Sequence, residues 1–103
     1  MIRRRRLADV VARQLELFGR EHAGLIRDCE VAEDAYDRAD RDEAEERYGD
    51  YLDLVETAAE VLAELRDGYA STLDEATAAE YGRDFRQAVA RRFPAVAVQV
   101  DDL

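Results

Sequence analysis

The chain of 103 residues is long enough for one domain with a modest core and too short for two. A hydrophobic share of 48% beside a charged share of 39%, with one proline and five glycines, is typical of amphipathic helices and argues against disorder or a β-sandwich. The net charge of −10 disfavours nucleic acid as a partner and favours a basic one. We therefore expect an all-α domain that does not bind nucleic acid.

The N-terminal segment does not read as a membrane anchor or a secretion signal. The arginine run Arg3–Arg6 is followed by LADVVARQLELF, in which Asp9 and Glu16 interrupt the apolar residues. No window of the sequence approaches the roughly 18 consecutive apolar residues that span a membrane. The single cysteine, Cys29, cannot form an internal disulfide, which agrees with a reducing compartment. We expect a cytoplasmic protein without membrane contact.

A heptad seam predicts a first helix over about residues 3–38. Its apolar positions alternate in steps of four and three: Val11, Leu15, Phe18, His22, Leu25, Cys29, Ala32, Tyr36 and Ala39. A second seam with the same alternation predicts a helix over about residues 42–71: Tyr48, Tyr51, Val55, Ala58, Leu62, Leu65 and Tyr69.

The interval of nine residues from Ala39 to Tyr48 fits neither a heptad nor a step of three or four. Each seam also becomes polar when it is extended into the other half of the chain. A turn at about residues 39–41 lets both apolar stripes meet, so we expect an antiparallel hairpin. Its register pairs seam residues across the two helices: Val11 with Tyr69, Leu15 with Leu65, Phe18 with Leu62, His22 with Ala58, Leu25 with Val55, Cys29 with Tyr51, and Ala32 with Tyr48. A domain-swapped dimer with one continuous helix remains the alternative.

The turn is highly charged, with nine charged residues among the eleven from Asp37 to Arg47. Asp40 and Glu43 have the spacing of a capping box, and Asp42 with Glu45 offers a second choice. The turn therefore supplies its own cap for the second helix.

A third, shorter helix is expected over about residues 73–93. Thr72 and Glu75 have capping-box spacing at its start, and Pro94 ends its apolar stripe. The alternating AVAVQV segment lies in the remaining stretch, 94–103, which we expect to be an extended tail.

Apolar residues off the seams indicate a further surface to be covered. The short third helix reaches only part of the hairpin, so Ile26, Val31, Leu52 and Leu54, towards the turn, stay bare. We therefore expect a homodimer that forms a bundle of four long helices. An acidic ridge on the second helix is either solvated or binds a divalent ion or a basic partner. The predicted interaction surface combines both features: Ile26, Val31, Leu52, Leu54, Glu56, Glu60 and Glu64.

No chemistry-bearing motif stands out. There is no glycine-rich phosphate loop, and Ser71 is the only serine. His22 and Cys29 are seam residues, so we interpret both as core residues and predict no catalytic residue, cofactor or metal ligand. The expected function is that of a non-enzymatic helical-bundle protein acting through protein–protein interaction, as an adaptor, regulator or assembly subunit. The alternative is a metal or small-ligand site at a dimer interface, near Glu21, His22 and Glu56.

Overall fold

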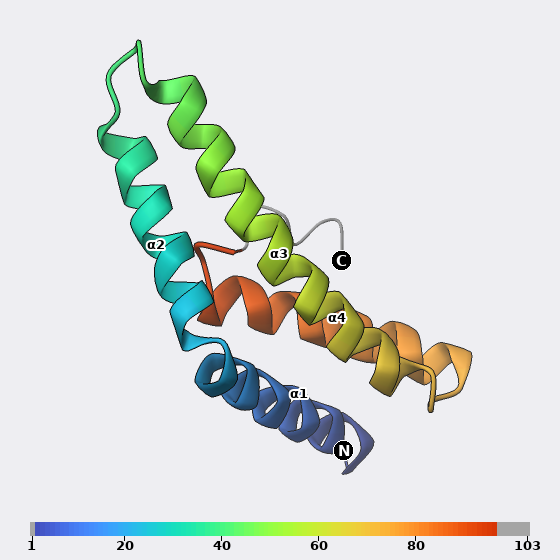
Figure 1. Ribbon diagram of the computed structural model, residues 1–103. Helices are drawn as coiled ribbons and strands as arrows, with labels where there is room; N and C mark the ends of the chain where they lie inside the picture. Colours follow the sequence, from blue (N-terminus) through green and yellow to red (C-terminus); the bar gives the residue numbers. More distant parts are fainter. Residues whose placement is uncertain (1, 97–103) are drawn as a thin grey trace.

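The computed structural model describes residues 2–96, which form four helices and, within that range, no strand. In chain order they are α1 (Ile2–Glu21), α2 (Ala23–Arg38), α3 (Ala44–Ala70) and α4 (Glu75–Arg92). Helices α2 and α3 run antiparallel beside each other, while α1 packs against α4 (Figure 1). The all-α prediction is confirmed, with four helices in place of three.

The helix predicted over residues 3–38 is divided by a bend at His22. There φ is −121° and ψ is 31°, outside the helical region. The His22 N–H donates to the Phe18 carbonyl at 2.9 Å and the Ile26 N–H to the His22 carbonyl at 3.0 Å, so hydrogen bonds flank the bend on both sides. Gly24 lies two residues after His22, and glycine is a common companion of kinks.

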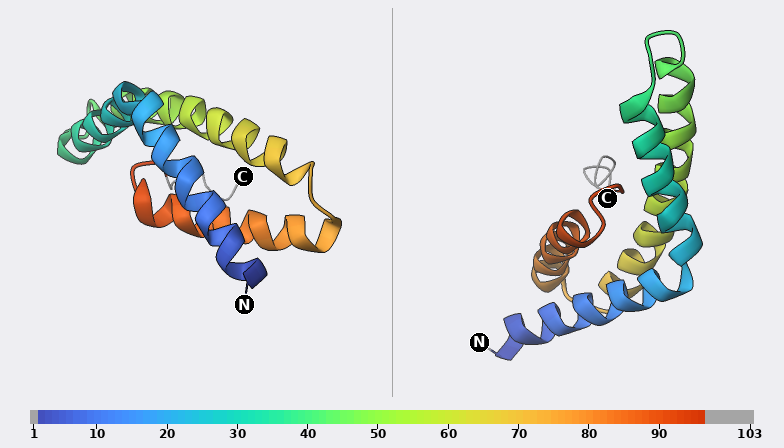
Figure 2. Two further views of the ribbon diagram at one scale, coloured as in Figure 1. Left: turned by 90° about the horizontal axis from the view of Figure 1, so that it is seen from below. Right: turned by 90° about the vertical axis from the view of Figure 1, so that its left-hand side faces the viewer.

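Phe93, just after α4, packs against the last turn of α1, before this bend. Its ring lies edge-on to Phe18 with centroids 5.3 Å apart. A Cβ atom at Gly19 would lie 3.5 Å from the same ring, so this glycine brings the α1 backbone close to Phe93. The contact ties the end of α4 to α1, and Figure 2 shows α1 running across α4 beyond the bend.

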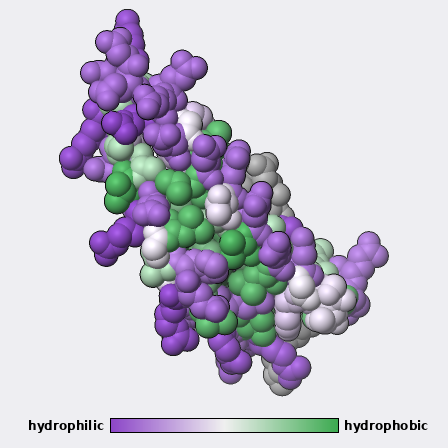
Figure 3. All heavy atoms as spheres, in the orientation of Figure 1, coloured by the Kyte–Doolittle hydropathy of each residue, from purple (hydrophilic) through white to green (hydrophobic). Residues whose placement is uncertain are grey.

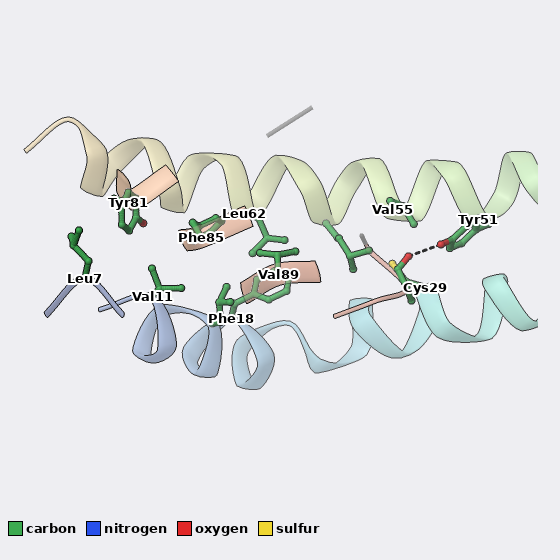
Figure 4. Packing of buried hydrophobic residues seen from close by; sticks show 14 residues of the cluster. Leu7, Val11, Phe18, Cys29, Tyr51, Val55, Leu62, Tyr81, Phe85 and Val89 are labelled. Carbon is green, nitrogen blue, oxygen red and sulfur yellow. Dashed lines mark hydrogen bonds between the residues drawn. The ribbon is translucent and has the colours of Figure 1, made fainter. Parts of the chain in front are cut away.

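The core is continuous from α1 to α4, and several of its members are drawn in Figure 4. In α1 to α3, every buried residue except Leu7 belongs to one of the two predicted seams. The buried set is Leu7, Val11, Leu15, Phe18, Cys29, Tyr51, Val55, Ala58, Leu62, Tyr81, Phe85, Val89, Ala95 and Val96. At about 25 cal/mol per Å² of buried apolar surface, such a core is the main stabilising term.

Aromatic contacts define how α2 meets α3 near the turn. The ring of Tyr48 lies 5.2 Å from that of Tyr36, one helical turn closer to the loop than its predicted partner Ala32. This ring contact joins α2 to α3 beside the turn.

Neither predicted capping box caps its helix. Asp40 Oδ1 accepts a hydrogen bond from the Glu43 N–H at 3.1 Å within the turn, whereas the N-cap of α3 is Glu43, whose side chain makes no capping hydrogen bond. Thr72 does not cap α4, because its hydroxyl donates to the Tyr69 carbonyl at 2.7 Å. The cap is Asp74, whose Oδ1 accepts from the Thr77 N–H at 2.8 Å.

A tyrosine of α3 anchors the segment after α4. The Tyr51 hydroxyl donates to the buried Ala95 carbonyl at 2.6 Å, and Glu33 Oε2 lies 3.1 Å from the same hydroxyl. Burial and the neighbouring Glu33 carboxylate raise the pKa of Tyr51 well above its usual value, so the group stays protonated. Residues 94–96 form a turn, and the rest of the predicted extended tail, 97–103, lies outside the described residues.

Substitution of this tyrosine tests the anchor. Tyr51→Phe leaves the Ala95 carbonyl without its donor, so we expect the free energy of unfolding in urea to fall by about 1–3 kcal/mol. The matched control is Tyr48→Phe, whose side chain is 40% exposed and for which we expect a change below about 0.5 kcal/mol. Equal losses from the two variants would contradict the anchoring role.

Candidate interaction surface

The layer formed by α2 and α3 has one covered face and one open face. In the right-hand view of Figure 2, α4 and the segment after it lie on one side of this layer. Phe93 and Ala95 make their contacts on that side. We call the opposite surface of α1, α2 and α3 the open face.

The open face carries two shallow hollows, with volumes of about 250 and 280 Å³. The first lies between α2 and α3 and is lined by Asp28, Val31, Ala32, Ala35, Arg47, Asp50 and Leu54. The second lies between α1 and α3 and is lined by Gln14, Leu17, Phe18, Glu21, His22, Val61, Glu64 and Leu65.

Helical spacing joins the two hollows into one surface. Most lining residues lie one position before the core seams, so they occupy a second stripe in steps of three and four. When the seams of two antiparallel helices face each other, the positions just before the seam residues point to the same side of the layer. Gly24 and Thr57 fall on the same stripes between the hollows, and both are exposed.

Apolar side chains run along this surface. Val31 is 62% exposed and Leu17 is 45% exposed, while Leu54 and Val61 are partly exposed. Figure 3 shows apolar residues forming a band across the visible face of the molecule, bordered by polar ones. We call Leu17, Val31, Leu54 and Val61 the apolar band. Contiguous exposed apolar surface of this kind is typical of a protein-binding site.

The structure brings together only part of the predicted interaction surface. Val31 and Leu54 line the first hollow together. Ile26 and Leu52 are both partly exposed, but they line neither hollow.

The predicted acidic residues are also divided. Glu64 lines the second hollow, whereas Glu56 and Glu60 are exposed on α3 away from both hollows. The prediction omitted Leu17 and Val61, two of the four residues of the apolar band. Heptad spacing could have found both residues, because Leu17 lies fourteen residues before Val31 and Val61 lies seven residues after Leu54.

The alternative metal site gains little from this geometry. Glu21 and His22 line the second hollow with Glu64, but Glu56 does not. In residues 2–96, no group of three or more histidine, cysteine or acidic side chains could hold a metal ion.

Cys29 is fully buried between α2 and α3. Burial is the main cause that raises the pKa of its thiol, and the negative charges of Asp28, Glu30 and Glu33 add to it. The thiolate, which is the nucleophilic form, is therefore disfavoured.

Comparisons complete this description. No helix within residues 2–96 is long and apolar enough to cross a membrane. No protein-family model, curated protein or solved structure matches the chain.

Thiol labelling checks the assignment of Cys29 to the core. We expect Ellman's reagent at pH 8 to react with the native protein at least about 100-fold more slowly than with the protein in urea, because reaction requires opening of the α2–α3 contact. A native rate close to that in urea would show an accessible thiol and contradict this placement.

Proposed function

We propose that this protein is a non-enzymatic interaction protein that works as a homodimer, with the open face as its binding surface. It would serve as an adaptor, regulator or assembly subunit. The observation that carries the proposal is the apolar band, because Val31 and Leu17 expose 62% and 45% of their surface on a single face.

The shape of the open face suits another helical layer. The two hollows follow the lines where α2 and α1 meet α3, and the groove between adjacent helices is where the side chains of a partner helix fit. Two such layers, packed open face to open face, form a four-helix arrangement with each α4 on the outside. A second copy thus covers the apolar band without any rearrangement of the core.

Catalysis and metal binding have weaker support. The two ionisable groups with raised pKa values in α2 and α3, Cys29 and Tyr51, are buried and held in their neutral forms. His22 lines the second hollow, yet the described residues offer no three-ligand cluster around it. The small-ligand alternative therefore ranks behind the interaction function.

A charge placed in the apolar band tests the proposal. Val31→Asp puts a carboxylate where we expect apolar burial, so it should raise the dimer dissociation constant by roughly 10-fold to 100-fold. Sedimentation equilibrium over a wide concentration range measures this constant. The control is Ala79→Asp on the exposed side of α4, which adds the same charge and should leave the constant unchanged.

Two results would count against the proposal. A wild-type protein that stays monomeric up to tens of micromolar removes the homodimer. A dimer that Val31→Asp and Ala79→Asp weaken equally removes the open face as its interface.

A further inference from the structure

Carboxylates line both hollows of the open face. Asp28 and Asp50 lie in the first hollow and Glu21 and Glu64 in the second, and all four are exposed. The apolar band runs between them, so a partner on this face meets apolar surface and negative charge together.

These carboxylates are not neutralised within the protein. In the described part of the chain, none of the four forms an ion pair within 4 Å. Arg47 is the one arginine that lines either hollow, and its Nη2 already lies 3.6 Å from Glu43 Oε2. The hollows therefore carry an excess of negative charge.

Helix α3 is the wall that the two hollows share. It runs without interruption from Ala44 to Ala70, while the opposite wall changes from α2 to α1 at the bend. Gly24 lies on the open-face stripe between the hollows, and no atom lies within 4 Å of where its Cβ would be. An elongated partner can therefore follow α3 from one hollow to the other.

The margins of the open face differ in charge. On α3, the exposed Asp53 and Glu60 directly precede residues of the apolar band. On α1 and α2, the exposed Arg20 and Arg27 directly precede lining carboxylates and offset part of their charge. The unbalanced negative charge is therefore concentrated along α3.

A second copy of the chain satisfies only one of these two features. It covers the apolar band, but it also brings the same carboxylates close to their counterparts, and like charges within reach repel. A helix with an apolar stripe and basic residues beside it satisfies both, because an amphipathic helix can lay its stripe in a groove while its charges meet the carboxylates.

We propose that the open face binds a basic amphipathic helix of another protein, which lies along α3 and competes with the second copy. At 1.5 Å per residue, a helix of about 18 residues covers α3 from Arg47 to Leu65. This inference rests on the open face of the proposed function and adds the chemistry of the partner. The homodimer is then the weaker complex, which the basic helix displaces.

Three synthetic peptides of about 18 residues test the chemistry of the partner. The first has leucines in steps of three and four with lysines beside them, the second has glutamine in place of lysine, and the third is a scrambled form of the first. By fluorescence anisotropy at low salt, the first should bind at least about 10-fold more tightly than the other two, and added salt should weaken it. Equal affinity for the lysine and glutamine peptides would contradict the role of charge.

Neutral variants of α3 test the site. Asp50→Asn with Glu64→Gln should weaken binding of the lysine peptide by roughly 10-fold and should tighten the homodimer, because it removes attraction in one complex and repulsion in the other.

The matched control is Glu16→Gln with Glu30→Gln, which makes the same change in net charge. Both residues are exposed, line neither hollow and directly follow core residues. We expect less than about a threefold change in either dissociation constant, and circular dichroism verifies that each variant is folded. Equal effects of the two pairs would show that the peptide senses only net charge, which overturns the inference.

The outcomes separate this inference from the proposed function. If the lysine peptide fails to bind, or binds without dissociating the homodimer, the inference is overturned, while the proposed function stands as long as Val31→Asp weakens the dimer. If the wild-type protein never dimerises but the α3 variants weaken peptide binding as expected, the homodimer is removed and the site for a basic helix stands.

Discussion

The packing of Phe93 against the end of α1 is the contact on which the arrangement depends. It holds the end of α4 against Phe18 and Gly19, and Tyr51 fixes the following residues through the Ala95 carbonyl. Because of these contacts, α4 covers one side of the α2–α3 layer. The other side is left without a helix to cover it, so the position of α4 determines where the apolar band is exposed.

The charge distribution gives this open side its character. Among residues 5–96, no charged side chain is buried, so the core contributes stability through apolar packing rather than through ion pairs. The charges lie at the surface, and most of the excess acid is on α3. Carboxylates also line both hollows of the open face, Asp28 and Asp50 in the first and Glu21 and Glu64 in the second.

Periodicity predicted the core well, because burial of a helix stripe follows directly from residue spacing. The seams supply every buried residue of α1, α2 and α3 except Leu7. The bend at His22 was not predictable in the same way, since the heptad phase passes through it unchanged and a glycine alone is a weak signal. The contact made by Phe18, just before the bend, comes from Phe93, about seventy residues away in sequence, and local patterns carry no information on such a pairing.

The interaction surface was predictable only in part, for a related reason. Which off-seam apolar residues stay exposed depends on how the helices pack, which leaves Ile26 half-buried against the core and Leu17 open. The cap of α4 shows that local composition alone does not always identify the capping residue. Thr72 and Asp74 both suit the role by composition, and the backbone geometry decided for Asp74.

The central claim is that the open face is the interface between two copies of the chain, and a distance across the dimer tests it directly. Spin labels at Gly24→Cys, in a Cys29→Ala background, lie in the middle of the proposed interface. Since packed helices are about 8–10 Å apart, electron double resonance should give a distance on the order of 20 Å between the two labels. Labels at Ala79→Cys on α4 should give a clearly longer one. A longer distance for Gly24 than for Ala79 would contradict the account.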